Sequence, residues 1–171
     1  MHERLIRARE FALAAHNTQI YGGIYPYYKH LEDVHDILVR FMFTEEEDLA
    51  ILTASFLHDT IEDTATSHSD IKKIFGEEIA DIVYDMSDEL GRSREEKKAK
   101  TYSKTRLNHK SVILKVADRI ANVTFSSTQN SKHIQMYREE HNDFEKNLRI
   151  YRQVDDMWEY LRSITFPIVV S

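Results

Sequence analysis

The chain has 171 residues with no cysteine, four glycines, two prolines and a formal net charge of −6. Without cysteine it can form neither a disulfide framework nor a thiolate metal site, so a metal would need histidine and carboxylate ligands. The acidic balance argues against a broad basic surface for nucleic acid, but it is compatible with a small phosphorylated ligand in a locally basic pocket. Hydrophobic residues make up 42% of the chain, so we predict one all-α domain spanning residues 1–171.

The N-terminal segment lacks the composition of an export signal. The stretch MHERLIRAREFALAAHN carries charges at Glu3, Arg4, Arg7, Arg9 and Glu10, which interrupt any apolar core. No later segment reaches the roughly 18 consecutive apolar residues of a membrane-spanning helix. We therefore expect a cytoplasmic protein that does not enter a membrane.

Three helices are expected before the main polar cluster. A helix over residues 3–16 ends before YGGIYP, where two glycines and a proline indicate a loop, and a second helix covers residues 28–41. Thr44 and Glu47 have the spacing of a capping box, which predicts that a third helix begins there. Its run ILTASFL is apolar on more than one face, so this helix should be buried.

The rest of the chain is also expected to be helical. Helical spacing of apolar residues predicts helices near residues 71–75, 77–88, 132–149 and 154–164, and over SVILKVADRIANVTF. Ser93 and Glu96 have capping-box spacing at the start of the charged stretch SREEKKAKTYSKTR, whose composition is typical of a solvated helix face. The pattern predicts about eight helices and no convincing strand.

Four ionisable residues follow the buried third helix in HDTIED: His58, Asp59, Glu62 and Asp63. If the helix continues through them, His58 and Glu62 share one ridge while Asp59 and Asp63 share the next. Carboxylates packed this closely repel one another, so a metal ion is the simplest positive group to place among them. The alternative is a solvated helix end whose carboxylates simply face water.

Two further residues fit a metal site. Asp118 lies in the otherwise apolar helix VILKVADRIANV, where a lone carboxylate is costly unless it binds a metal or a partner, and His30 opens the second helix. With His58 and Asp59 they make a nitrogen and oxygen ligand set suited to Mn, Fe, Co or Zn. Such a set leaves coordination positions open, as in a catalytic centre. Glu62 and Asp63 would then orient or deprotonate the nucleophile and assist the leaving group.

Several of these segments together resemble a known family. They are FALAAHNTQ, PYYKHLEDV with His30, HDTIEDT, FGEEIADIV and KVADRIANV. They are similar to the HD phosphohydrolase superfamily, and specifically to the hydrolase domain of RelA/SpoT homologues and the small alarmone hydrolases. The resemblance covers most of the chain and implies an all-α HD fold.

The resemblance also implies roles for individual residues. His30, His58, Asp59 and Asp118 would bind one metal, usually Mn²⁺, with Fe²⁺, Co²⁺ or Zn²⁺ as alternatives. Glu62 and Asp63 would be the catalytic pair, and the reaction would remove the 3′-diphosphate from guanosine tetra- or pentaphosphate as pyrophosphate. Substrate contacts would come from Asn122, Arg119 and Tyr137. The simpler interpretations of these three are a surface amide, a salt bridge and core packing.

The chain departs from this family before His30. Relatives carry basic residues in that loop, whereas this chain has QIYGGIYPYY, whose tyrosines can stack on a base but bring no charge to a pyrophosphate. If the charged stretch folds over the pocket, positive charge would come from Lys97, Lys98, Lys100, Lys104 or Arg106. The sequence alone leaves that folding open.

Three functions remain in competition. The leading hypothesis is a hydrolase-only enzyme acting on (p)ppGpp or a close relative. The second keeps the site but changes the substrate, either to a pyrophosphorylated tRNA 3′ end, as in an antitoxin, or to a deoxynucleotide. The third is a non-catalytic HD sensor, which would be expected to lack some of the six site positions that are all present here. Oligomeric state, physiological metal and pathway stay open.

Overall fold

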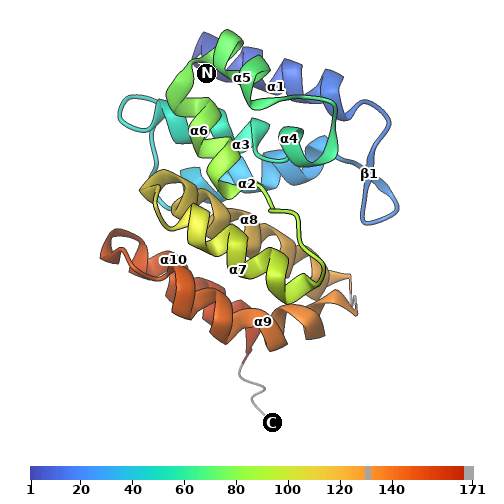
Figure 1. The fold of residues 1–171 in the computed structure, drawn as a ribbon, viewed down its shortest axis with the longest axis vertical. Coiled ribbons are helices and arrows are strands. Elements are labelled where there is room, and N and C mark those ends of the chain that lie inside the picture. The colour runs from blue at the N-terminus through green and yellow to red at the C-terminus, as the bar shows by residue number, and fades with distance from the viewer. Residues whose placement is uncertain (130–131, 168–171) are drawn as a thin grey trace.

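The computed structural model describes residues 1–129 and 132–167, and in this part of the chain the architecture is almost entirely helical (Figure 1). The helices are α1 (Glu3–His16), α2 (Tyr28–Arg40), α3 (Leu49–Leu57), α4 (Thr60–Asp63), α5 (His68–Phe75), α6 (Glu77–Met86), α7 (Arg94–Thr105), α8 (His109–Thr128), α9 (His133–Leu148), the 3₁₀ helix η1 (Arg152–Val154) and α10 (Asp155–Thr165). The all-α prediction is therefore confirmed. None of the helices in the described residues is long and apolar enough to cross a membrane.

The expectation of no strand is wrong at one place. Strands β1 (Ile20–Tyr21) and β2 (Tyr25–Pro26) pair antiparallel, with Ile20 opposite Pro26 and Tyr21 opposite Tyr25. The turn between them uses Gly22 and Gly23, both with positive φ, and a Cβ on Gly22 would come within 2.2 Å of Phe125 Cζ. Two-residue strands are too short to show alternation in the sequence, which is why the pattern predicted only a loop.

The third helix begins later than its capping-box spacing predicts. The Thr44 hydroxyl does accept a hydrogen bond from the Glu47 amide at 3.3 Å, but the Thr44 amide donates to Asp48 at 3.0 Å instead of to Glu47. This closes a turn, and α3 starts at Leu49. The reciprocal bond of a true box, from the Thr44 amide to the Glu47 carboxylate, is replaced by the bond to Asp48.

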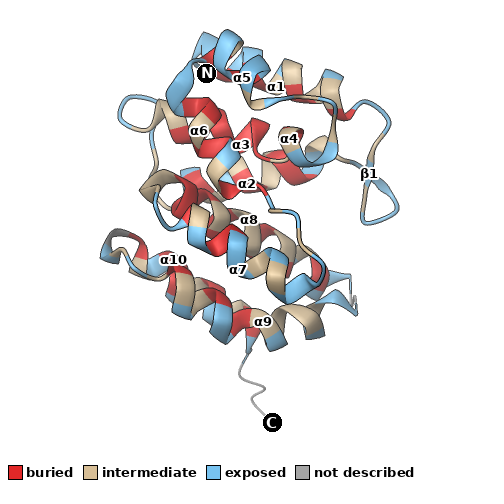
Figure 2. Ribbon diagram, viewed as in Figure 1, coloured by how far each residue is buried: buried red, intermediate tan, exposed pale blue. Residues whose placement is uncertain are grey.

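Helix α3 lies at the centre of the fold. It contacts α1, α2, α6 and α8, and every residue from Ile51 to Leu57 is buried, as the red ribbon in Figure 2 shows. The prediction that this helix is apolar on more than one face is thus confirmed. Because α3 is enclosed by its neighbours, the chain that leaves its C-terminal end emerges among several elements.

Helix α8 lies between two groups of helices and packs against both. On one side it packs against α2, α3 and α6, and on the other against α7, α9 and α10. Figure 1 shows α9 and α10 as a layer along the outer side of α7 and α8. In that layer Phe144 and Trp158 are fully buried, with ring centroids 5.3 Å apart. Each such large side chain stabilises the fold by roughly 1.5–3 kcal/mol.

Candidate active site

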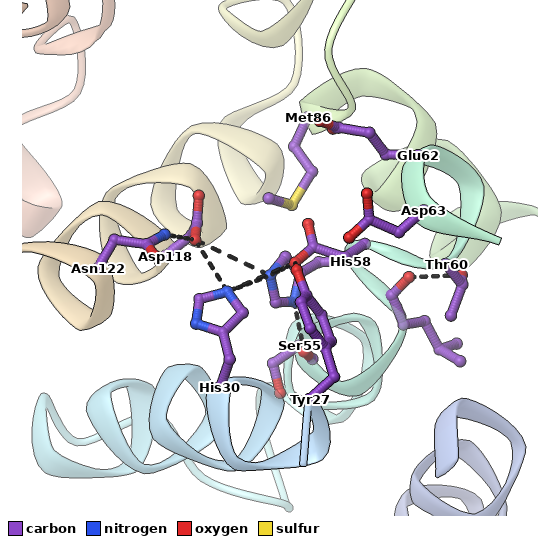
Figure 3. Close-up of polar contacts among 12 residues, drawn as sticks. Tyr27, His30, Ser55, His58, Thr60, Glu62, Asp63, Met86, Asp118 and Asn122 are labelled. Atoms are coloured by element: carbon purple, nitrogen blue, oxygen red, sulfur yellow. Dashed lines mark hydrogen bonds and ion pairs between the residues drawn. The ribbon is translucent and has the colours of Figure 1, made fainter. Parts of the chain in front are cut away.

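The four residues predicted to bind a metal come together at one point (Figure 3). His30 lies in the first turn of α2, His58 and Asp59 link α3 to α4, and Asp118 lies in the middle of α8. The two histidine Nε2 atoms are 3.2 Å apart. His30 Nε2 lies 3.2 Å from Asp118 Oδ1, and His58 Nε2 lies 3.0 Å from Asp59 Oδ2. One ligand atom each from His30, His58 and Asp118 falls within 4.8 Å of the others.

The helix does not continue through this motif, so the ridge arrangement expected from the sequence is wrong. Helix α3 ends at Leu57 and α4 begins at Thr60. The Thr60 hydroxyl donates to the Leu57 carbonyl at 2.7 Å, and His58 Nδ1 contacts the Ser55 carbonyl at 2.8 Å. These bonds satisfy carbonyls that the helix end leaves free. The break lets the adjacent side chains of His58 and Asp59 face the same cluster, whereas in a helix they would diverge by about 100°.

The contact with Ser55 determines which nitrogen of His58 is available. A carbonyl only accepts hydrogen bonds, so Nδ1 carries a proton and Nε2 is the nitrogen that faces the cluster. His58 is fully buried and His30 is 2% exposed. A histidine held through one nitrogen by a backbone carbonyl is the usual support of a metal ligand. The local geometry therefore fits a metal.

The charges of the cluster fit a cation as well. Burial lowers the pKa of His30, but the hydrogen bonds that its ring donates to Asp118 and Asp59 outweigh this effect and raise that pKa to about 10. Burial likewise opposes the charged forms of the two carboxylates, yet the histidines beside them lower the pKa of both Asp59 and Asp118. The site thus holds two negative charges that require positive charge between them, which a divalent ion bound by these four residues would supply.

Tyr21 of the hairpin, Tyr27 at the start of α2 and Asn122 of α8 support the carboxylates. The Tyr27 hydroxyl donates to Asp59 Oδ2 at 2.6 Å, and Asn122 Nδ2 donates to Asp118 Oδ1 at 2.5 Å. The Tyr21 hydroxyl donates to Asn122 Oδ1 at 3.1 Å. Sequence analysis missed these contacts of the two tyrosines, because only the fold brings the hairpin against α4 and α8. Asn122, predicted to contact substrate, orients Asp118 and also lines the cavity.

Glu62 and Asp63 lie on α4. Figure 3 shows the Asp63 carboxyl group turned towards the cluster and the Glu62 carboxyl group on the side of Met86. Glu62 Oε2 accepts a hydrogen bond from the Asp88 amide at 3.0 Å, and Asp63 Oδ2 accepts one from Gln19 Nε2 at 2.9 Å. Both residues are exposed, but partial desolvation of the Glu62 carboxyl group raises its pKa. Both face a cavity of about 260 Å³ that also contains His30, Asp59 and Asp118.

Cations form another wall of this cavity. They are Arg94, Lys97 and Lys98 of α7 and Lys115 and Arg119 of α8. The charged stretch therefore does fold over the pocket, because buried Thr101, Tyr102 and Thr105 seat α7 on the core. Of the five cations named in the charged stretch, Lys97 and Lys98 line the cavity, as does Arg119, which was named separately; Arg94 and Lys115 were missed.

The remaining three cations of the charged stretch lie outside the cavity lining. Lys100 pairs with Glu96 and donates to the Leu90 carbonyl, and Lys104 pairs with Glu89. Arg106 follows the end of α7 and is exposed. A list of charged residues does not say which helix face is inward, and that is set by the buried residues of α7.

Glu140 of α9 organises much of the cationic wall. Its carboxylate pairs with Arg94 at 2.7 Å, with Arg119 at 3.4 Å and with Lys98. Burial opposes its charged form, but these cations keep the pKa of Glu140 below its usual range. Lys115 donates to the Met86 carbonyl at 2.8 Å and to Asp88 at 3.1 Å.

Arg119 and Tyr137 occupy one corner of the cavity. The Arg119 guanidinium carbon lies 4.9 Å from the centre of the Tyr137 ring and 4.4 Å from that of Phe144. Tyr137 is half-buried, and burial raises its pKa to about 12. The salt bridge considered for Arg119 is present, and Tyr137 both packs on the core and lines the cavity.

Comparison with known proteins matches this architecture. A family model described as "HD domain" matches residues 8–144. The chain is 30% identical over 100 residues to a guanosine-3′,5′-bis(diphosphate) 3′-pyrophosphohydrolase of Drosophila melanogaster, covering 57% of this chain and 54% of that protein. It is 32% identical over 127 residues to a protein of that enzyme name from Aquifex aeolicus, covering 71% of this chain and 17% of the other. The chain thus spans about half of the first relative and a smaller part of the second.

Solved structures show the same fold. One, described as a metazoan ortholog of SpoT that hydrolyzes ppGpp, superposes with a TM-score of 0.80 at 23% identity, covering 96% of this chain and 94% of that one. A Listeria monocytogenes protein superposes with a TM-score of 0.63 at 26% identity, covering 80% and 98%.

The pKa of His30 predicts how stability depends on pH. Because this pKa is raised from 6.5 to about 10, metal-free folded protein keeps a proton that the unfolded chain releases. The resulting stabilisation is complete below about pH 6.5 and is lost as the pH rises towards 10. Urea denaturation of metal-free protein should therefore give a free energy of unfolding that falls over this range, and falls less in His30→Gln. If the free energy of unfolding falls equally with pH in the wild type and in His30→Gln, a raised pKa of His30 is contradicted.

Proposed function

The chain belongs to the HD-domain family, and on that premise we propose that it is a metal-dependent phosphohydrolase that removes the 3′-diphosphate from guanosine tetra- or pentaphosphate, or a close relative. The observation that carries the proposal is one cavity with an acidic floor and a basic wall. The floor combines the histidine and aspartate cluster with Glu62 and Asp63, and the wall is built by α7 and α8. Such a cavity suits a substrate with clustered phosphates. The curated relatives named above support this substrate class.

His30, His58, Asp59 and Asp118 are the proposed metal ligands, and residues 1–171 the proposed HD unit. Two nitrogens and two carboxylates suit Mn²⁺, Fe²⁺, Co²⁺ or Zn²⁺, and we propose Mn²⁺ on the family resemblance. Such an ion, when bound, polarises a phosphoryl oxygen and lowers the pKa of water. Because the substrates are free nucleotides, we propose the cytoplasm as the site of action.

Glu62 and Asp63 are the proposed catalytic pair. Water attacks the phosphorus bonded to the 3′ oxygen, the bond between that phosphorus and O3′ breaks, and the products are pyrophosphate and a 3′-hydroxyl. Asp63, oriented by Gln19, accepts the proton of the attacking water. Glu62, whose pKa is raised by burial, donates a proton to O3′, since a raised pKa favours the acid form.

The cationic wall takes the place of a basic loop before His30. Lys97, Lys98 and Arg119 face the cavity, and we propose that they bind the phosphates. A guanidinium or ammonium paired with a phosphate oxygen makes a strong charge-assisted hydrogen bond. Asn122 and Tyr137, which also line the cavity, are the proposed contacts to the nucleoside.

The test of the proposal is pyrophosphate release by metal-stripped protein with and without added Mn²⁺. The substrates are ppGpp, GTP, dGTP and tRNA pyrophosphorylated at its 3′ end. We expect Mn²⁺-dependent release from ppGpp. Release from the modified tRNA without release from ppGpp would assign the chain an antitoxin function. Release from dGTP without release from ppGpp would assign it a deoxynucleotide hydrolase function. Inactivity on all four would favour a sensor.

Substitutions should separate the metal ligands from the catalytic pair. Asp59→Ala removes a ligand, so we expect loss of both Mn²⁺ binding and turnover. Glu62→Gln keeps the shape but cannot donate the same proton, so we expect Mn²⁺ to bind while kcat falls about 10²–10⁴-fold. Calorimetric titration with Mn²⁺ and steady-state kinetics measure the two effects. Equal loss of metal in both variants would contradict the division of roles.

The phosphate-binding role proposed for the cations of α7 can be tested by substituting two lysines of that helix. Lys97 lines the cavity, whereas Lys100 is bound to Glu96 and the Leu90 carbonyl outside it. Lys97→Met should raise the KM for ppGpp about tenfold, the loss of a charged hydrogen bond worth about 1.5 kcal/mol. Lys100→Met should leave KM within about twofold, since exposed pairs contribute little. A similar rise in both would show that only the total charge of α7 matters.

A further inference from the structure

We propose that His16 and Gln19 are positioning residues that orient Asp63 towards the metal cluster, an inference that rests on the catalytic role proposed for Asp63. Both lie in FALAAHNTQ, at and just beyond the end of α1. Neither lines the cavity, so any effect on the reaction must pass through other side chains. The pair is connected to the site by two separate contacts.

The first contact is a chain of hydrogen bonds. Gln19 Nε2 donates to Asp63 Oδ2 at 2.9 Å, across 44 positions of sequence, and Gln19 Oε1 lies 2.8 Å from His16 Nδ1. Asn17, with φ of 37°, ends α1 and turns the chain. The Gln19 amide donates to the His16 carbonyl at 2.7 Å, and the Gln19 carbonyl accepts from the Tyr27 amide at 3.0 Å. Gln19 is therefore held by its backbone on both sides.

Only one assignment of donors and acceptors is consistent along the hydrogen bonds that join His16, Gln19 and Asp63. An ionised carboxylate only accepts, so the amide nitrogen of Gln19 must face Asp63 and its oxygen must face His16. His16 must then donate through Nδ1. Its Nε2 is buried and has no hydrogen-bond partner within the described part of the chain. The proton on Nδ1 thus decides which way the Gln19 amide points, and with it whether Asp63 meets a donor or an acceptor.

The second contact runs through Tyr27. The His16 ring stacks on the Tyr27 ring, with centroids 4.5 Å apart and planes 17° from parallel. The Tyr27 hydroxyl donates to Asp59 Oδ2 at 2.6 Å, and Figure 3 shows Tyr27 reaching from the start of α2 towards the cluster. His16, which is only 4% exposed, is therefore connected to Asp63 through Gln19 and to Asp59 through Tyr27. It links the position of the proposed proton acceptor to that of a proposed ligand.

The kinetic test compares two substitutions of His16. Asn can place an amide N–H near the position of Nδ1, so His16→Asn should keep most of kcat, whereas His16→Leu should lower it about 10–100-fold, the usual effect of losing such a support. Gln19→Met should lower kcat to a similar extent. In all three, KM should stay within about twofold, and in Gln19→Met, which keeps the stacking of His16 on Tyr27, Mn²⁺ affinity should also stay within about twofold. His141→Leu, the same change at another buried histidine on α9, controls for lost stability.

The result that overturns the proposal is equal kcat in His16→Asn and His16→Leu, or a loss in His141→Leu as large as in His16→Leu. A second measurement does not depend on activity. Nitrogen-15 NMR of metal-free protein should show the His16 proton on Nδ1; a proton on Nε2 alone would refute the inferred order of donors. If the wild type releases no pyrophosphate while the proton is on Nδ1, the proposed function fails and the orientation of Gln19 stands.

Discussion

The repulsion between two largely buried carboxylates is the constraint on which the rest of the site depends. Asp59 and Asp118 come from the turn after α3 and from the middle of α8, and each is only 17% exposed. Two such charges are stable together only if positive charge lies between them. His30 and His58 are placed to share a cation with them, and Tyr27 and Asn122 occupy some of the remaining acceptor positions. Because α3 and α8 are core helices, the packing of the core sets the geometry of the cluster.

Negative and positive charges are also balanced in the cavity around the cluster. Its acidic floor would repel a polyphosphate, and the cations of α7 and α8 offset that charge. Glu140 keeps Arg94, Lys98 and Arg119 close together although they have like charge. A net charge of −6 is thus compatible with an anionic substrate, because the positive charge is concentrated where phosphates would lie.

Residue types were enough to predict the helical class and to pick out four residues that the fold brings together, because buried charge in an apolar helix, as at Asp118, is costly without a partner. Spacing was less informative where tertiary contacts change the backbone. The break at His58 and Asp59 depends on bonds from Thr60 and His58 to helix carbonyls, and an i, i+4 count assumes that no such break occurs. The inward face of α7 and the contacts of Tyr21 and Tyr27 arise only from packing between distant segments. For that reason Lys100, Lys104 and Arg106 were placed with Lys97 and Lys98, and Lys115 and Arg94 were missed.

The central claim is that these four side chains bind one divalent cation together. The most direct measurement is a crystal structure of Mn²⁺-loaded protein with anomalous diffraction collected at the manganese edge. The account predicts one strong anomalous peak in contact with Nε2 of His30, Nε2 of His58 and carboxylate oxygens of Asp59 and Asp118. A peak bound by Glu62 and Asp63 alone, or no peak in protein that needs Mn²⁺ to release pyrophosphate, would contradict it.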